Sequence, residues 1–105
     1  MDMKELLDFI AKEDEFLRNH YGYPDNEKRI LARTVKLGEE FGELCNEILA
    51  HNSFQRKEKL DKHDKENIQH EFADVLITTL LLAKTMNIDI EKALETKIEK
   101  IKKRY

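Results

Sequence analysis

The chain has 105 residues, enough for one helical core, and we expect a single domain over residues 1–105. Its 40% apolar and 39% charged residues, with three glycines and one proline, are typical of a charged, helix-rich globular protein rather than a disordered one. A net charge of −3 gives no sign of binding to a nucleic-acid polymer through bulk charge.

Cysteine usage and hydropathy indicate a cellular setting. Cys45 is the only cysteine, which excludes an internal disulfide and a cysteine zinc cluster and favours a reducing compartment. The longest apolar stretch, about residues 75–83, contains two threonines and is much shorter than the ~20 residues of a membrane span. The acidic start of the chain is unlike a secretory signal. We therefore expect a soluble, cytoplasmic protein without a membrane partner.

The first helix is predicted from Asp2 to about His20. Asp2 and Glu5 form a capping-box pattern. Apolar residues then recur at helical spacing, at Met3, Leu6, Leu7, Ile10 and Leu17. Pro24 lacks an amide hydrogen, so residues 21–24 are predicted to form a turn.

The second helix is predicted to begin at a cap formed by Asp25 or Asn26. It carries three stripes at helical spacing. The apolar stripe is Ile30, Thr34, Leu37, Phe41, Leu44 and Ile48. The acidic stripe is Lys36, Glu40, Glu43 and Glu47. The third contains small residues, at Gly38, Gly42, Cys45 and Leu49. A glycine inside a helix costs about 1 kcal/mol relative to alanine, so we expect another backbone to approach this stripe closely.

A charged segment, Asn52 to Lys65, is predicted to be a solvated loop, with or without a helical extension, that lets the chain turn back. The alternative for its basic residues is a phosphate-binding patch. The third helix is predicted from about Asp64 to Met86. Between Phe72 and Ala83 it is apolar almost all round, which predicts burial on most sides, partly against another subunit.

A fourth helix follows. Asn87 is predicted to end the third helix and Asp89 to cap the fourth. The apolar stripe of the fourth helix is Leu94, Ile98, Ile101 and Tyr105. Four helices without a strand pattern predict an all-α, four-helix-bundle-type fold. The surplus of apolar surface predicts a homo-oligomer, a dimer or a tetramer.

Two carboxylate pairs stand out on the second and third helices. Glu40 with Glu43, and Glu71 with Asp74, are each three residues apart and so lie on one helix face. If the two faces meet, four carboxylates form a cage of oxygen atoms. Asp74 lies in the segment predicted to be buried, where an ionised carboxylate needs a partner. That partner is either a cation or a basic side chain such as Lys36, Lys84 or Lys97.

Carboxylate oxygens without cysteine or histidine favour Mg²⁺, or Mn²⁺, as the cation. A di-iron bundle site would use Glu-x-x-His from two helices, but Glu66 and His70 are four residues apart and Glu71-x-x-Asp74 contains no histidine. The plain structural alternative is a solvated acidic face on the second helix, with Asp74 in an ordinary ion pair at the edge of the bundle.

The combined pattern, Glu39-Glu40-x-x-Glu43 followed by Glu71-x-x-Asp74, resembles the signature of the MazG-like all-α nucleoside triphosphate pyrophosphohydrolases. The amino-acid sequence of residues 36–44 is also similar to that of the family, and the resemblance extends from about Ile30 to the end of the chain. It implies an enzyme that cleaves nucleoside triphosphates, non-canonical or deoxy ones in a housecleaning role, between the α- and β-phosphates.

The resemblance also implies roles for particular residues. The metal ligands would be Glu40, Glu43, Glu71 and Asp74. Glu39 would be the general base, with Glu47 as the alternative, and Lys36 and Lys97 would contact the substrate. Aromatic residues near the first turn are available for the base of the nucleotide, namely Phe16, His20, Tyr21 and Tyr23.

One position departs from the family pattern. Ile101 stands where the family has an asparagine shortly before its carboxyl end, and this puts in doubt the nucleotide contacts made by the fourth helix. The departure favours the alternative function, a non-catalytic helical interaction protein that retains the fold.

Overall fold

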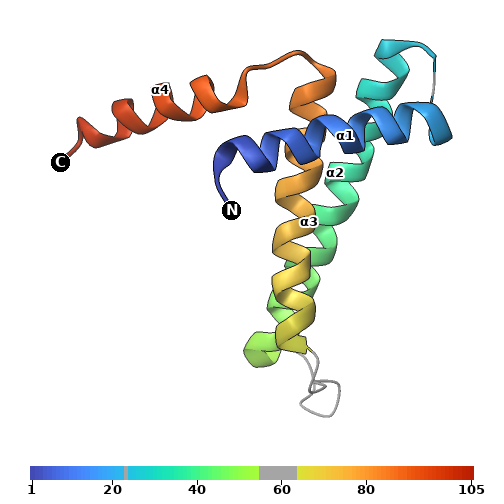
Figure 1. Cartoon of the computed structure of the whole chain (residues 1–105). Coiled ribbons are helices and arrows are strands. Elements are labelled where there is room, and N and C mark those ends of the chain that lie inside the picture. Colours follow the sequence, from blue (N-terminus) through green and yellow to red (C-terminus); the bar gives the residue numbers. More distant parts are fainter. Residues whose placement is uncertain (23, 55–63) are drawn as a thin grey trace. The chain divides into compact units, whose positions relative to one another are not determined.

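The computed structural model describes residues 1–22, 24–54 and 64–105. These residues form four α-helices, a short π-helical turn and no strand. The α-helices are α1 (Met3–Tyr21), α2 (Asn26–Leu49), α3 (Asp64–Thr85) and α4 (Ile90–Lys102), and the turn η1 (Ala50–Phe54) extends α2 (Figure 1). The predicted all-α class is confirmed. Most of the predicted charged loop, and Tyr23, lie outside the described residues.

The helix ends follow from capping side chains. Asp2 caps α1 by accepting a hydrogen bond from the Glu5 amide at 2.8 Å, and Asp89 caps α4 by accepting one from the Lys92 amide at 3.1 Å. Asp25 accepts from the Glu27 amide at 3.0 Å at the start of α2. Asn87 has a positive φ of 57°, a conformation that asparagine tolerates, and it ends α3 as predicted.

The chain divides into two compact units. The first contains Met1–Ile30 and Leu80–Tyr105. Its apolar centre is formed by α1 and the last turns of α3: Ile10 is 2% exposed, and Leu81 and Ala83 are 8% exposed. Two polar residues, Asp14 and Thr85, are buried with them. Helix α4 contains no buried residue: in its predicted apolar stripe Leu94 is 41% and Ile98 48% exposed, and Ile101 is half-buried.

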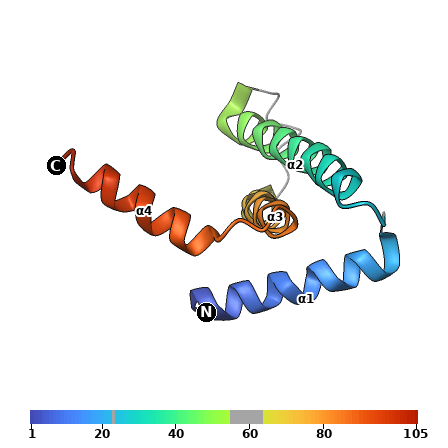
Figure 2. The same cartoon turned by 90° about the horizontal axis from the view of Figure 1, so that it is seen from above.

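The second unit, Leu31–Thr79, holds most of α2 and α3. The two helices lie side by side and run in opposite directions (Figures 1 and 2). Leu44 of the apolar stripe is buried. A pair of helices can cover only one face of each, which explains why this chain alone does not bury α3 on most sides in this unit; burial against another subunit stays a prediction. Phe72 is 49% and Leu76 64% exposed.

The small-residue stripe of α2 gives a second difference. A Cβ atom placed on Gly38 or Gly42 would meet nothing within 4 Å, so the close approach of another backbone predicted there is absent from the described part of this chain. Among the same described residues, no helix is long and apolar enough to cross a membrane. The cytoplasmic setting stays a prediction.

Candidate metal centre

An acidic cluster forms where α2 and α3 lie side by side. Glu40 and Glu43 come from one face of α2, and Glu71 comes from α3. One carboxylate oxygen from each residue lies within 4.8 Å of the others. Glu40 is buried, Glu71 is partly buried and Glu43 is exposed. The antiparallel pairing of two helices thus brings together three of the four carboxylates predicted as metal ligands, from positions far apart in the sequence.

The cluster is electrostatically strained. Burial raises the pKa of the Glu71 carboxyl above its ordinary value, because the charged form loses hydration. Neighbouring negative charges raise the pKa further, those of Glu43, Asp74, Glu40 and Glu47. The same field that penalises the ionised carboxylate of Glu71 would attract a cation.

Two oxygen atoms of the cluster lack hydrogen bonds. Oε2 of Glu40 and Oε2 of Glu71 are buried and have no partner among the described residues. A buried carboxylate oxygen left without a donor is costly, whereas coordination to a cation satisfies it. The donor set is three carboxylates, the oxygen ligands that Mg²⁺ and Mn²⁺ prefer. The residues present therefore fit such an ion.

Lys36 borders the cluster. Its Nζ atom lies 3.1 Å from Oε1 of Glu40 and 3.6 Å from Oε2 of Glu39. The hydrogen bond and the charge of Glu40 raise the pKa of the Lys36 ammonium group, which keeps it protonated. One oxygen of Glu40 is thus paired with Lys36, and the other is the buried Oε2. Glu39, the predicted general base, is exposed beside the same lysine.

Asp74 differs from its expectation. The sequence placed it in an apolar interior, but its side chain is exposed and it is absent from the group of three carboxylates that meet. Its charge nevertheless raises the pKa of Glu71, so it belongs to the rim of the cluster. The burial falls instead on Glu40, which is buried, and on Glu71, which is partly buried.

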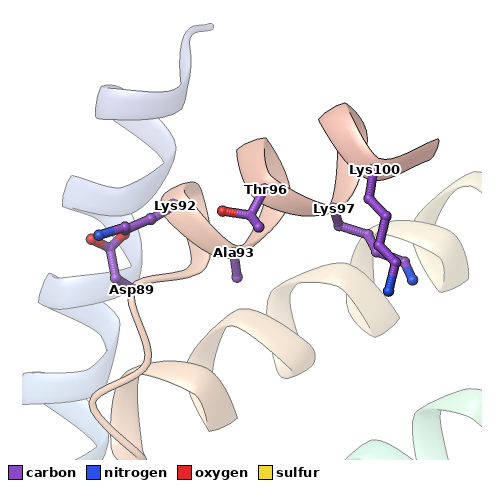
Figure 3. A pocket seen from close by; sticks show the side chains of 6 residues that line it. All are labelled: Asp89, Lys92, Ala93, Thr96, Lys97 and Lys100. Carbon is purple, nitrogen blue, oxygen red and sulfur yellow. The ribbon is translucent and has the colours of Figure 1, made fainter. Parts of the chain in front are cut away.

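Lys97 lies on α4, in the other compact unit, and lines a pocket of about 500 Å³. Figure 3 shows the side chains of Lys97 and Lys100 extending in the same direction from one side of α4. The remaining lining residues are Asp89, Lys92, Ala93 and Thr96. Two neighbouring lysines form a positive patch suited to phosphate as point charges.

Three of the aromatic residues predicted to contact the nucleotide base lie together near the end of α1: Phe16, His20 and Tyr21. The rings of Phe16 and His20 are stacked, with centroids 4.1 Å apart, and Tyr21 is tilted against Phe16 at 6.5 Å. Nδ1 of His20 lies 2.9 Å from the carbonyl oxygen of Phe16, a contact that fixes the imidazole ring against its own helix. Phe16 remains 48% and Tyr21 74% exposed.

The helices and the cluster define an all-α protein with an acidic group suited to a divalent cation. Residues 28–105 match the family model of the MazG nucleotide pyrophosphohydrolase domain, and the chain belongs to this family. The match confirms the resemblance seen in the sequence, and it begins near the start of α2, after α1. At the level of the family, membership indicates a nucleotide pyrophosphohydrolase.

A relative in Bacillus subtilis (strain 168), described as the uncharacterized protein YpjD, is 29% identical over 96 residues. The similarity covers 89% of this chain and 79% of that protein. No solved structure matches the chain significantly.

Proposed function

We propose that the protein hydrolyses nucleoside triphosphates, non-canonical or deoxy ones, between the α- and β-phosphates. A water molecule forms a bond to the α-phosphorus, the bond from that phosphorus to the bridging oxygen breaks, and the products are a nucleoside monophosphate and pyrophosphate. Family membership supports the reaction class. The observation that carries the proposal for this chain is the cluster of Glu40, Glu43 and Glu71, with its two buried oxygens that lack partners.

The proposed ligands of a Mg²⁺ or Mn²⁺ ion are Glu40, Glu43, Glu71 and Asp74. Three of these meet within 4.8 Å, and Asp74 is close enough to raise the pKa of Glu71. When bound, such an ion supplies charge neutralisation for the triphosphate and Lewis-acid polarisation of a phosphoryl oxygen. The carboxylates of the cluster would hold the ion on one side of the α2–α3 pair, where its charge would offset their negative field.

The remaining residues have proposed roles in proton transfer and substrate binding. Glu39 is the proposed general base: its side chain is exposed, and its Oε2 atom lies 3.6 Å from Nζ of Lys36. Glu47 is the alternative, since it is partly buried and its charge reaches Glu71. Lys36 and Lys97 are the proposed cations for the phosphates. Comparing Glu39→Gln with Glu47→Gln assigns the base to whichever variant loses turnover while still binding metal.

The proposed assembly is a homo-oligomer, a dimer or a tetramer. Six positions of α2 alternate four and three residues apart, the spacing of a coiled-coil seam. We call this the glycine face: Leu31, Val35, Gly38, Gly42, Cys45 and Leu49. Leu31 is 61%, Val35 67% and Leu49 50% exposed, and the two glycines meet nothing in the described chain. A second copy of the helix would bury the leucines and give the glycines the close backbone they lack.

The test is an assay of pyrophosphate release from a panel of canonical, deoxy and modified nucleoside triphosphates with Mg²⁺ or Mn²⁺. Cleavage to the monophosphate and pyrophosphate in a metal-dependent manner supports the proposal, and Glu40→Gln should abolish it. Glu95→Gln, which removes an exposed carboxylate on α4, is the matched control. A folded protein that cleaves no member of the panel would instead favour the non-catalytic interaction protein that Ile101 suggests.

A further inference from the structure

A second, polar pocket lies in the compact unit formed by Met1–Ile30 and Leu80–Tyr105. Its volume is about 280 Å³, and every residue that lines it is charged or polar. The lining residues are Asp14 and Arg18 of α1, Asn26 and Arg29 of α2, Lys84 and Thr85 of α3, and Asn87 after it. None of them belongs to the acidic cluster, the α4 patch or the motif that identifies the family.

The pocket carries net positive charge. Three cationic side chains, Arg18, Arg29 and Lys84, face one carboxylate, Asp14, which leaves +2 among the lining residues. Asp14 is 5% exposed and forms an ion pair with Arg18, with Oδ2 and Nε 3.2 Å apart. Because a buried carboxylate needs its partner, this pair holds the Arg18 guanidinium group at the wall of the pocket.

Arg29 is also held in place. One terminal nitrogen donates to the carbonyl oxygen of Pro24 at 3.3 Å, and the other donates to Oδ1 of Asn26 at 3.0 Å. A side chain fixed in advance loses less entropy when it binds a ligand. The turn after α3 is fixed as well, since the amide of Asn87, which has positive φ, donates to the carbonyl oxygen of Lys84 at 3.1 Å.

Lys84 supplies the third positive charge of the pocket. It is exposed, and among the residues that the structure describes it has no ion-pair partner. An ammonium group with three hydrogen-bond donors therefore lines the same pocket as the guanidinium of Arg18 and the side-chain amide of Asn87. Arginine and lysine around a small polar pocket are the donor set that a phosphate group needs, and a dianion would neutralise its surplus of charge.

We propose that this pocket binds a phosphate group, as inorganic phosphate or as a phosphate ester, independently of the metal cluster. The phosphate oxygens accept hydrogen bonds from the side chains of Arg18, Lys84 and Asn87, while the ion pair with Asp14 keeps Arg18 in position. The proposal holds whether or not the acidic cluster performs hydrolysis, because it rests on different residues.

The experiment is a titration with inorganic phosphate, and separately with a nucleoside monophosphate, followed by amide chemical shifts with a metal chelator present. Shifts at residues 14–18 and 84–87 are expected at millimolar or lower ligand concentrations. Lys84→Gln should weaken binding about tenfold, since it removes one charge-assisted contact without disturbing an ion pair. Lys103→Gln, with the same loss of charge at the exposed end of α4, should leave it unchanged.

The outcomes separate the alternatives. Tighter binding of the monophosphate identifies a phosphate ester as the ligand, and equal binding identifies free phosphate. Retained binding in Glu71→Gln separates this pocket from the metal cluster. Three results would each overturn the proposal. The first is an equal loss of phosphate binding in Lys84→Gln and Lys103→Gln, and the second is a loss of binding in Lys97→Gln alone. The third is the absence of chemical-shift changes at residues 14–18 and 84–87 at millimolar phosphate.

Discussion

Glu40 of α2 and Glu71 of α3 bring carboxylate oxygens within 4.8 Å of each other, and Oε2 of each is buried without a hydrogen-bond partner among the described residues. Two like charges so placed repel each other and destabilise the pairing of the two helices. A cation between the two carboxylates, or protonation of one of them, relieves this repulsion. Lys36 pairs with Oε1 of Glu40 and has no ion pair with Glu71 among the described residues. The predictions about metal and pH follow from this relationship.

Divalent cations should stabilise the folded protein. At a free concentration a hundredfold above Kd, a ligand that binds only the folded state adds about 2.7 kcal/mol. For a domain of this size that corresponds to a rise in Tm of roughly 10 °C. Thermal unfolding with Mg²⁺, Mn²⁺ and a chelator measures the effect. Glu71→Gln should abolish the rise and Glu95→Gln should preserve it; a rise that persists in Glu71→Gln would place the ion elsewhere.

The contribution of Glu71 to the stability of the metal-free protein should fall as pH increases through the carboxylate range. The folded state raises the pKa of Glu71 above its ordinary value of 4.5, so the protonated form is the one that folding favours. The stabilisation that protonated Glu71 contributes is complete below the ordinary pKa of 4.5, and it is lost as pH rises through the raised pKa of the folded state. Denaturant unfolding at a series of pH values measures this.

Glu71→Gln supplies the control for the pH dependence, because its uncharged amide does not titrate. The variant should be more stable than the parent chain above the raised pKa, and the difference should shrink at lower pH. Saturating metal should also remove the pH dependence that distinguishes the parent chain from the variant, because coordination favours the deprotonated carboxylate of Glu71. A parent and variant with parallel pH profiles would mean that Glu71 is not strained in the folded state.

Local sequence signals were sufficient for the helices. Asp2 and Asp89 cap helices as predicted because a capping interaction involves residues only three apart, and Asn87 ends α3 because its own conformation allows a positive φ. Burial was harder to predict. Whether Leu76 or Asp74 is covered depends on how many helices surround α3, and an apolar run cannot distinguish cover by this chain from cover by a second copy.

In the candidate site too, local spacing was predictable from the sequence, whereas contacts between helices were not. The spacing of Glu40 and Glu43 placed both on one face of α2, and the register of α3 against α2 then selected Glu71 as their partner. That register depends on packing between residues distant in sequence. The pocket around Asp14 and Arg18 was missed for the same reason: its residues come from three helices, and none forms a motif along the chain.

Asp74→Asn should reduce turnover without unfolding the protein. The residue is exposed, so the substitution costs little packing, but its charge acts directly on Glu71. As a proposed metal ligand it should cost at least about 100-fold in kcat/KM, more than the loss typical of residues that only support a ligand. Circular dichroism checks the helices and pyrophosphate release checks the rate. Turnover retained at the parent level would remove Asp74 from the proposed ligand set and leave the other three.

The glycine face gives a prediction in which the sign of the effect identifies the partner. In the described chain a Cβ on Gly42 meets nothing within 4 Å, so Gly42→Ala in an isolated protomer should stabilise α2 by about 1 kcal/mol through helix propensity alone. If a second copy packs against this face, the added methyl group separates the two backbones and weakens the assembly instead.

Light scattering after gel filtration, together with denaturant unfolding at several protein concentrations, distinguishes the two outcomes for Gly42→Ala. We expect weaker association and a midpoint that depends on concentration, as in an oligomer whose folding and assembly are coupled. Val35→Asp should weaken association too, because it places a charge on an apolar surface that is 67% exposed in the single chain. A parent protein that is strictly monomeric, with Gly42→Ala more stable at every concentration, would show that the glycine face has no partner in a second copy of the chain.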